Sequence, residues 1–341
     1  MKKKHGFGII GLGVIAETHA AAIGNMENAE LKAVIDNDPE HARDFAKRYG
    51  GDSFTSLEKF LKCPDLEFVT ITTPSGYHGD AAIAALKAGK HVIVEKPLEI
   101  TTERCKKIIE TANENGVTLS GIFQCRFYDS SIKIREALDQ GRFGKIILCN
   151  GYSKCHRSQE YYDGGAWRGT KAVDGGGALM NQAIHTLDLL LWFCGDVKEV
   201  SCRSATMAHE RIEVEDVLVS TLLFENGAMG TAEASTAVWP EVPKQIEILG
   251  TKGSVVMEED KIVRWEFMDK KPEDENVIKQ FKELDSKNYL GHKRQFEDFI
   301  RAVENGGKPL VDGFEATKAV ALVEAMYKSA ASGKPVSVSN L

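Results

Sequence analysis

The feature that most constrains this chain is a glycine turn between an apolar segment and a helical segment near its amino terminus. Residues 7–10 are apolar and predict a buried strand, and they run directly into Gly11-Leu12-Gly13-Val14-Ile15-Ala16. A helix is expected next, over residues 17–25. Strand, glycine turn and helix in this order are the context of a dinucleotide-binding site. We therefore expect a Rossmann-like domain in which a pyrophosphate lies at the amino terminus of that helix.

The small residues of this turn have distinct expected roles. Gly11 permits the tight turn, Gly13 lets the backbone approach a pyrophosphate, and Ala16 packs the helix against the strand. Glycine turns are common in proteins, so the flanking strand and helix support the prediction more than the turn alone. The cofactor-binding candidates here are Gly11, Gly13, Val14, Ile15 and Ala16.

The next predicted strand, residues 31–35, ends in Asp36, at the distance from the glycines where a carboxylate receives the ribose hydroxyls of the adenosine. The residues that follow it, 37–39, include no cation for a ribose phosphate, which favours NAD over NADP. The alternative is that this acidic segment only caps the helix that starts near Pro39. Both can hold, because Asp38 is the natural cap and Asp36 is the end of the strand.

Three further strands are expected at residues 68–72, 91–94 and 117–123, with helices between them. Ligands of open α/β sheets bind at the carboxyl ends of the strands, and each of these strands ends in polar residues. Pro97 also confines Lys96 to an extended conformation. The alternatives are a solvated surface lysine for Lys96 and a capping or surface role for His78. The cofactor-binding candidates at these strand ends are Thr73, Pro74, His78, Glu95, Lys96 and Gln124.

The second half of the chain contains a long polar loop, residues 156–177, after a predicted strand that ends at Tyr152. Such a loop with exposed aromatic residues and arginine is typical of a ligand-binding segment rather than of an inert connector. Aromatic faces stack on sugar or nicotinamide rings, and a guanidinium group recognises phosphate or carboxylate. Tyr152, Trp167 and Arg168 are therefore candidates for substrate binding.

Residues 181–194 predict a helix that is apolar around most of its circumference and hence buried. Its polar exceptions are Asn181, His185 and Asp188, which fall within roughly 60° of one another on an ideal helix. Buried polar groups either satisfy each other or line a cavity. A single histidine of this kind would indicate a structural residue, but three polar residues on one stripe beside a polar loop indicate a site.

Strands without intervening helices follow, so the second half is predicted to be α+β. Together with the first half, the predicted fold is an α/β Rossmann domain at residues 1–123 and an α+β domain at residues 124–341. The predicted strands of the second domain beyond residue 152 are 197–205, 217–224, 229–237, 245–249, 254–257 and 261–267, and the last helices are 289–304 and 314–332.

Composition limits the partners of the chain. A net charge of -7 over 341 residues argues against a nucleic-acid partner, which would require a basic face. No apolar segment is long enough for a signal peptide or a membrane span. The seven cysteines are scattered and include no C-x-x-C pair, which indicates reduced thiols in a cytoplasm and no metal site.

Several of these motifs together resemble those of the Gfo/Idh/MocA family of NAD(P)-dependent sugar oxidoreductases. They are the glycine turn, Thr73-Pro74 with His78, Glu95-Lys96-Pro97, and Gly176-Gly177-Ala178-Leu179 with His185 and Asp188. The resemblance implies a Rossmann domain followed by an α+β domain with a large open, mostly antiparallel sheet that often mediates homodimers or homotetramers. It also implies that Lys96 and His185 face the nicotinamide and the sugar.

The resemblance implies an NAD-dependent dehydrogenase that acts on a secondary hydroxyl of a sugar or cyclic polyol. His185 is expected to take the hydroxyl proton while hydride leaves the same carbon, and Lys96 to stabilise the developing alkoxide. Asp188 is expected to fix the tautomer of His185. Many family members have aspartate four residues before the histidine, whereas this chain has Asn181, which can orient a hydroxyl or the imidazole but cannot accept a proton.

The choice of substrate stays open at this point. Within the family, residues 167–170 with residues 175–182 are most similar to members that oxidise the 3-hydroxyl of nucleotide-linked amino-sugar acids. Inositols, aldoses and phosphosugars are the alternatives. A non-catalytic NAD-binding sensor is an alternative of another class. Such a protein would be expected to lack the lysine or the histidine, and this chain has both Lys96 and His185.

Overall fold

The computed structural model describes residues 4–281 and 288–338, and these form two compact units. The first unit comprises residues 4–124 with 288–317, and the second comprises residues 125–281 with 318–338. The sequence-based division placed its boundary between residues 123 and 124, and the compact units divide between residues 124 and 125. It assigned residues 288–317 to the second domain, whereas they pack into the first unit. They do so because a helix within these residues packs its apolar face into the core of the first unit.

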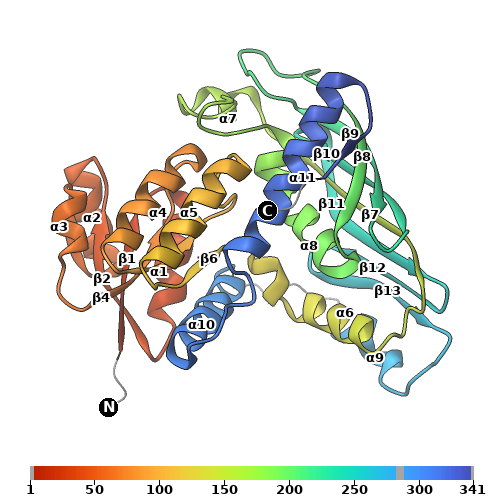
Figure 1. Cartoon of the computed structure of the whole chain (residues 1–341), viewed down its shortest axis with the longest axis horizontal. Coiled ribbons are helices and arrows are strands. Elements are labelled where there is room, and N and C mark those ends of the chain that lie inside the picture. The colour runs from red at the N-terminus through yellow and green to blue at the C-terminus, as the bar shows by residue number, and fades with distance from the viewer. Residues whose placement is uncertain (1–3, 282–287, 339–341) are drawn as a thin grey trace. The chain divides into compact units, whose positions relative to one another are not determined.

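The first unit is built on a parallel sheet of six strands (Figure 1). The order is β3-β2-β1-β4-β5-β6, and each neighbouring pair is parallel. This order places the carboxyl ends of β1, β2, β4 and β5 at one edge, as the sequence predicts for a Rossmann domain. The strands are β1 (His5–Ile10), β2 (Ala29–Ile35), β3 (Asp52–Phe54), β4 (Leu66–Ile71), β5 (His91–Val94) and β6 (Leu119–Gly121).

Helices connect these strands, and α1 packs beside α10 while α4 packs beside α5. The core between sheet and helices includes the stacked rings of Phe7 and Phe68, whose centroids lie 4.9 Å apart. Phe296, Phe299 and Ile300 of α10 are fully buried in the same cluster, which is why this late helix belongs to the first unit. The helices are α1 (Val14–Gly24), α2 (Pro39–Tyr49), α3 (Leu57–Leu61), α4 (His78–Lys87), α5 (Thr102–Glu114) and α10 (Leu290–Asn305).

The second unit is built on an eight-stranded sheet in the order β13-β12-β11-β7-β10-β9-β8-β14. Only β7 and β10 pair in parallel, and the other neighbours are antiparallel. The predicted fold class, a Rossmann domain followed by a mostly antiparallel α+β domain, is therefore confirmed. The strands are β7 (Ile146–His156), β8 (Val197–Ala205), β9 (Val217–Phe224), β10 (Met229–Ser235), β11 (Ala237–Gly250), β12 (Gly253–Glu258), β13 (Lys261–Phe267) and β14 (Val336–Ser337).

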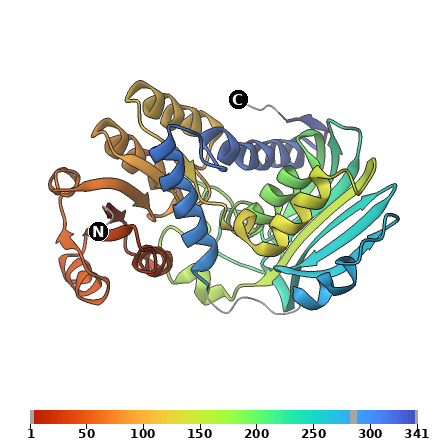
Figure 2. The same ribbon diagram turned by 90° about the horizontal axis from the view of Figure 1, so that it is seen from below.

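One face of this sheet packs against a helix, as Figure 2 shows. A Cβ atom at Gly151 of β7 would lie 2.8 Å from side-chain atoms of Thr186 and Leu190 on α8, so the backbone of β7 lies directly against that helix. The predicted single helix over residues 181–194 is instead a π-helical segment, η3 (Ala178–Ala183), followed by α8 (Ile184–Cys194). The remaining helices are α6 (Asp129–Asp139), α7 (Gln159–Asp163), α9 (Asp274–Gln280) and α11 (Gly313–Ser332), which begins in the first unit and ends in the second.

The structure bears on two properties considered from composition, membrane-spanning segments and the state of the cysteines. Within residues 4–281 and 288–338, no helix combines the length and the apolar character needed to cross a bilayer. All seven cysteines are free thiols, and six of them are buried.

Candidate active site

The glycine turn at the end of β1 has the geometry expected of a phosphate-binding turn. Gly11 has φ +87°, and a Cβ atom there would lie 2.8 Å from atoms of Thr73, so only glycine fits. A Cβ at Gly13 would meet nothing within 4 Å, which leaves its backbone open to a ligand. Ala16 is fully buried, whereas Val14 is 87% exposed and Ile15 partly exposed. The first turn of α1 has no side-chain cap, so its N–H groups can bind an anion.

Asp36 lies beside this turn at the end of β2. Its Oδ2 atom accepts a hydrogen bond from the Leu12 N–H at 3.1 Å, and its Oδ1 accepts from the Asp38 N–H at 3.0 Å. Asp38 caps α2 by accepting from the N–H groups of Glu40 and His41. The two roles considered for this acidic segment therefore belong to different residues. Asp36 is left with a carboxylate next to the glycine turn, where ribose hydroxyls can donate to it.

Two buried polar atoms that follow strands of the first unit have no hydrogen-bond partner among the described residues. They are Thr73 Oγ1, after β4, and Gln124 Oε1, after β6. Buried polar atoms are nearly always satisfied, so these two indicate a ligand that supplies the missing partners. Both residues were cofactor-binding candidates, and hydroxyl and amide groups of a dinucleotide fit them chemically. Pro74 is the residue before the short 3-10 helix Ser75–Tyr77, and so fixes the start of that turn.

His78 is the first residue of α4 and is 1% exposed. Its Nδ1 is 2.8 Å from the carbonyl oxygen of Pro97, and its Nε2 is 2.8 Å from the carbonyl oxygen of Thr73. Burial lowers the pKa of His78, while the two carbonyl contacts act in the opposite direction. The imidazole therefore joins the loop after β4 to the loop that contains Lys96, and it is covered by both.

Glu95 supports Lys96 through a buried network. Glu95 Oε2 accepts from the backbone N–H of Lys96 at 3.0 Å, and Oε1 lies 2.8 Å from His19 Nε2 and 3.4 Å from His292 Nε2. Burial alone would raise the pKa of Glu95, but the hydrogen bonds from the two histidines outweigh burial and hold this pKa well below its ordinary value. Burial lowers the pKa of His19. These shifts in pKa indicate that the Glu95 carboxylate is ionised and accepts hydrogen bonds from two imidazole N–H groups.

This network connects three elements that are distant in the sequence, and it was not predicted from the sequence. His19 is on α1, the helix that begins at the glycine turn, and its Nδ1 is 2.7 Å from Thr70 Oγ1 on β4. His292 is on α10. The only sequence signal was a histidine within the alanine-rich segment after the turn. The ligand atoms of His19, Glu95 and His292 lie within 4.8 Å of one another, so these residue types could hold a metal, although their contacts are at hydrogen-bonding distances.

In the second unit, a buried glutamate holds the start of the π-helical segment. Glu215 accepts from the N–H groups of Gly177 at 3.1 Å and Leu179 at 2.8 Å, and from the hydroxyl of Tyr327 at 3.0 Å. A Cβ atom at Gly176 or Gly177 would overlap Tyr327 or Glu215, which accounts for the glycines. π-Helical turns are frequent at functional sites. Glu215 and Tyr327 thus set the orientation of the segment that contains Asn181.

The structure separates the three residues of the predicted polar stripe. Asn181 and His185 are partly exposed, whereas Asp188 is fully buried. Both carboxylate oxygens of Asp188 accept from the guanidinium of Arg126, at 2.7 to 3.1 Å. The guanidinium of Arg126 also lies over the ring of Trp192. A buried ion pair of this kind fixes α8 against the turn after residue 124, a role the sequence did not indicate for Asp188 or Arg126.

The polar loop brings two arginines to one aromatic ring. The guanidinium carbons of Arg157 and Arg168 lie 5.6 and 4.7 Å from the ring centre of Tyr161, and that of Arg168 also lies 5.0 Å from Trp167. Neither arginine forms an ion pair with a carboxylate among the residues that the structure describes. The buried Nε atom of Arg168 also has no hydrogen-bond partner there. Two unneutralised guanidinium groups beside an aromatic face are suited to an anionic ligand.

Tyr152 is not among these residues. It precedes the loop on β7, where side chains alternate between the two faces of the sheet. Gly151 faces α8, so Tyr152 points to the opposite face, where the Lys154 ammonium lies 4.2 Å from the centre of its ring. The candidate set in the second unit therefore includes Asn181, His185, Trp167 and Arg168, and Tyr152 lies apart from it.

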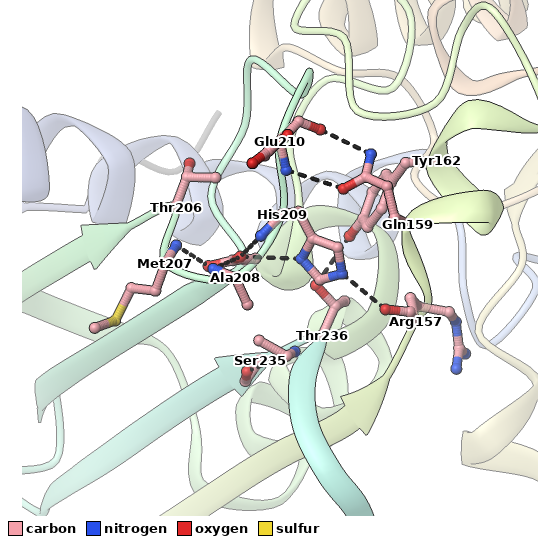
Figure 3. Close-up of polar contacts among 12 residues, drawn as sticks. Arg157, Gln159, Tyr162, Thr206, Met207, Ala208, His209, Glu210, Ser235 and Thr236 are labelled. Carbon is pink, nitrogen blue, oxygen red and sulfur yellow. Dashed lines mark hydrogen bonds and ion pairs between the residues drawn. The ribbon is translucent and has the colours of Figure 1, made fainter.

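A polar cluster holds the backbone of Arg157 in place (Figure 3). The Nε2 of His209 lies 2.7 Å from the carbonyl oxygen of Arg157, and its Nδ1 lies 3.0 Å from Asp216. The buried Asp216 also accepts from the N–H groups of Met207, Ala208 and His209. Burial alone would raise the pKa of Asp216, but these donors outweigh it and lower the pKa. In Figure 3 the guanidinium of Arg157 points away from this cluster, so the cluster fixes the backbone of Arg157 without engaging its guanidinium.

Comparisons with known proteins agree with this geometry. Residues 5–123 match the model of an oxidoreductase family with an NAD-binding Rossmann fold, and residues 131–256 match the model of a GFO/IDH/MocA C-terminal domain. The structure of the WlbA dehydrogenase from Bordetella pertussis, in complex with NADH and UDP-GlcNAcA, superposes with a TM-score of 0.94. It is 34% identical in sequence, and the match covers 99% of each chain.

Two further relatives are known by their activities. The levoglucosan dehydrogenase of Pseudarthrobacter phenanthrenivorans is 28% identical over 73% of this chain and 72% of its own. The inositol 2-dehydrogenase of Rhizobium meliloti is 24% identical over 97% of this chain and 98% of its own. The expected resemblance, oxidoreductase class and NAD-binding fold are confirmed by these matches. The chain therefore belongs to the Gfo/Idh/MocA family of oxidoreductases, and its amino-terminal unit is an NAD-binding Rossmann domain.

Proposed function

We propose that this enzyme oxidises the 3-hydroxyl of a nucleotide-linked amino-sugar acid with NAD as hydride acceptor. The observation that supports this substrate class is the pair of guanidinium groups, Arg157 and Arg168, beside the Tyr161 ring without a carboxylate partner among the described residues. An inositol or a simple aldose has no anionic group to match them, whereas a sugar acid linked to a nucleotide has both carboxylate and phosphate groups.

The proposed chemistry assigns different tasks to Lys96 and His185. NAD supplies the acceptor for the hydride. His185 takes the proton of the substrate hydroxyl, because imidazole is a base near neutral pH. Lys96 stabilises the negative charge that develops on the same oxygen, and Glu95 with its two histidine partners fixes the backbone that bears Lys96. Asn181 orients the substrate.

The relatives support this proposal over its alternatives. The WlbA dehydrogenase, which matches at 34% identity over 99% of the chain, was crystallised with NADH and UDP-GlcNAcA. The levoglucosan and inositol dehydrogenases are less similar, at 28% and 24% identity. A phosphosugar is the alternative that the two arginines also fit. A non-catalytic sensor would have no use for both Lys96 and His185.

The proposal is tested by following NADH formation from NAD with a panel of sugars. The panel contains UDP-GlcNAcA, UDP-N-acetylglucosamine, which lacks the sugar carboxylate but keeps the diphosphate, a hexose phosphate, myo-inositol and levoglucosan. We expect kcat/KM to be highest for UDP-GlcNAcA. Faster turnover of myo-inositol or levoglucosan would refute the proposed substrate class, and NAD binding without turnover of any member would favour the sensor.

Replacing Arg168 by alanine tests the anionic contact directly. A hydrogen bond to a charged group contributes about 1.5–3 kcal/mol, so KM for UDP-GlcNAcA should rise about 10- to 100-fold with a smaller change in kcat. Steady-state kinetics with UDP-GlcNAcA and with UDP-N-acetylglucosamine measure the effect. The control is Arg264→Ala, which removes an exposed arginine of β13. A loss confined to UDP-GlcNAcA would assign Arg168 to the sugar carboxylate, and an equal loss for both substrates would assign it to the diphosphate. An unchanged KM for both substrates would contradict the assignment of Arg168 to an anionic group.

We also propose a homodimer or homotetramer that assembles through the face of the large sheet opposite α8. Leu148, Val219 and Met229 on this face are 37%, 50% and 57% exposed, and Met229 pairs with Leu148 across β7 and β10. Exposed apolar residues in register on a sheet are typical of an interface.

Sedimentation velocity should show an oligomer for the wild type and a smaller species for a variant with Val219→Lys and Met229→Lys. Leu310→Lys, an exposed apolar position of the first unit, is the control and should not change the size; a monomeric wild type would refute this proposal.

A cytoplasmic location is proposed from the seven free thiols, since an oxidising compartment favours paired cysteines. A small-molecule sugar is the only partner that the proposal requires, besides NAD and the second copy of the chain. Fractionation of the source cells with a compartment marker would test the location, and recovery outside the cytoplasm would contradict it.

A further inference from the structure

Four side chains of the second unit form a continuous chain of hydrogen bonds, which we call the amide relay. Arg157 Nη2 donates to Gln182 Oε1 at 2.9 Å, and Gln182 Nε2 donates to Asn181 Oδ1 at 3.0 Å. Asn181 Nδ2 then donates to Asp174 Oδ1. The other oxygen of Asp174 accepts from the Gly169 N–H at 2.9 Å, and Asp174 is 2% exposed. A guanidinium and a buried carboxylate are thus joined through two neutral amides.

The two ends of the relay determine the orientation of both amides. A guanidinium can only donate hydrogen bonds, so Gln182 must turn its oxygen toward Arg157 and its NH₂ toward Asn181. An ionised carboxylate can only accept, so Asn181 must turn its NH₂ toward Asp174 and its oxygen toward Gln182. These two requirements agree along the whole relay. A substitution that exchanges donor for acceptor at either end of the relay reverses the orientation that the adjacent amide prefers. Two donors or two acceptors then face each other.

We propose that Asp174 is a positioning residue of the substrate site, which acts through the amide relay on Asn181 and on Arg157. This inference rests on the proposed function, in which Arg157 faces the anionic part of the substrate and Asn181, four residues before His185, orients the sugar. Its basis is geometric: Asp174 is buried and lies between the loop of Trp167 and Arg168 and the π-helical segment of Asn181. The relay thereby links recognition of the anion to the orientation of the sugar.

The relay also accounts for asparagine at position 181. A carboxylate at this position would face the carboxylate of Asp174 within hydrogen-bonding distance, and two carboxylates in such contact cannot both be ionised without a large cost. An amide at position 181 is the neutral partner that Asp174 requires. Exchanging the two residue types preserves every hydrogen bond of the relay. The amide introduced at position 174 would accept from the Gly169 N–H and donate to the carboxylate introduced at position 181.

The exchange provides the test. In the single variants Asn181→Asp and Asp174→Asn the relay is broken, and we expect kcat/KM for UDP-GlcNAcA to fall about tenfold or more, with NAD affinity unchanged. The double variant with both substitutions should recover to within about threefold of the wild type. The matched control is Asp163→Asn, an exposed aspartate of the same loop region, and it should leave kcat/KM unchanged.

The pH dependence of Asn181→Asp distinguishes positioning from a general loss of stability. One of the two facing carboxyls has a raised pKa in this variant, so it is protonated as the pH falls and can then donate to its neighbour as the wild-type amide does. Its kcat/KM relative to the wild type should therefore rise toward acidic pH. The double variant should show no such trend.

A measurement without substrate separates this inference from the proposed function. A carboxyl whose pKa is raised by folding stabilises the folded state at low pH, and this contribution is lost as the pH rises through the folded pKa. The melting temperature of Asn181→Asp relative to the wild type should therefore fall as pH rises, and that of the double variant should not. If the wild type does not oxidise UDP-GlcNAcA, the proposed function fails but this pH series still tests the relay. A double variant no better than Asn181→Asp in kcat/KM or in melting temperature would overturn the inference.

Discussion

Replacing Lys96 by methionine is expected to lower kcat by about 10²–10³, because a fixed positive charge no longer stabilises the developing alkoxide. Methionine keeps much of the length of the side chain and removes only its charge. NAD affinity should be retained, since the glycine turn and Asp36 are unchanged. Turnover is measured by NADH formation, and NAD binding by isothermal titration calorimetry.

The position of Lys96 in the structure makes this variant informative. Glu95 holds the backbone N–H of Lys96, and His78 holds the carbonyl of the following proline, so the loop keeps its conformation without the ammonium group. Lys87→Met, which changes an exposed lysine of α4, is the matched control and should have normal kinetics. A Lys96→Met variant with wild-type kcat would show that the alkoxide is stabilised by another group.

Replacing His185 by asparagine is expected to lower kcat by about 10²–10⁴, the usual contribution of a general base. Asparagine retains a polar side chain on α8 but cannot take the hydroxyl proton. The remaining activity should increase with pH, because solvent hydroxide then replaces the missing base. Measurements of kcat from neutral to alkaline pH, for the variant and the wild type, provide the comparison.

The control for this variant is His156→Asn, which changes a partly exposed histidine on β7. It should retain the wild-type kcat and pH profile. Residual activity of His185→Asn that does not depend on pH would mean that another group of the protein takes the proton. A reduction equal to that of Lys96→Met, with the same pH profile, would indicate that both residues act on a step other than proton transfer.

Features that depend on neighbouring residues in the sequence were predicted well. The glycine turn, the strand that ends in Asp36 and the Asp38 cap each occupy a short segment whose pattern is sufficient to define it. The alternation of strands and helices also predicted the parallel sheet. The strands without helices predicted the second sheet. These are local signals, and the structure reproduces them.

Features that depend on contacts between distant residues were not predicted. His19 and His292 meet Glu95 from 76 and 197 residues away, and Arg126 meets Asp188 from 62 residues away. Tyr152 was selected by its position in the chain, but the face to which a strand residue points is known only once the sheet is packed. The helical stripe of Asn181, His185 and Asp188 assumed one regular helix, whereas the π-helical segment changes the register before α8.

The return of α10 to the first unit has a consequence for the order in which this protein folds. Gln295 donates to the carbonyl of Gly121 and accepts from the N–H of Phe123, and Phe296 and Phe299 complete the core around Phe7 and Phe68. A ribosome that synthesises the chain from its amino terminus makes the six parallel strands first, but supplies α10 only after the whole large sheet except β14. The cofactor-binding unit, although first in the sequence, therefore acquires its complete core only after nearly all of the second sheet has been synthesised.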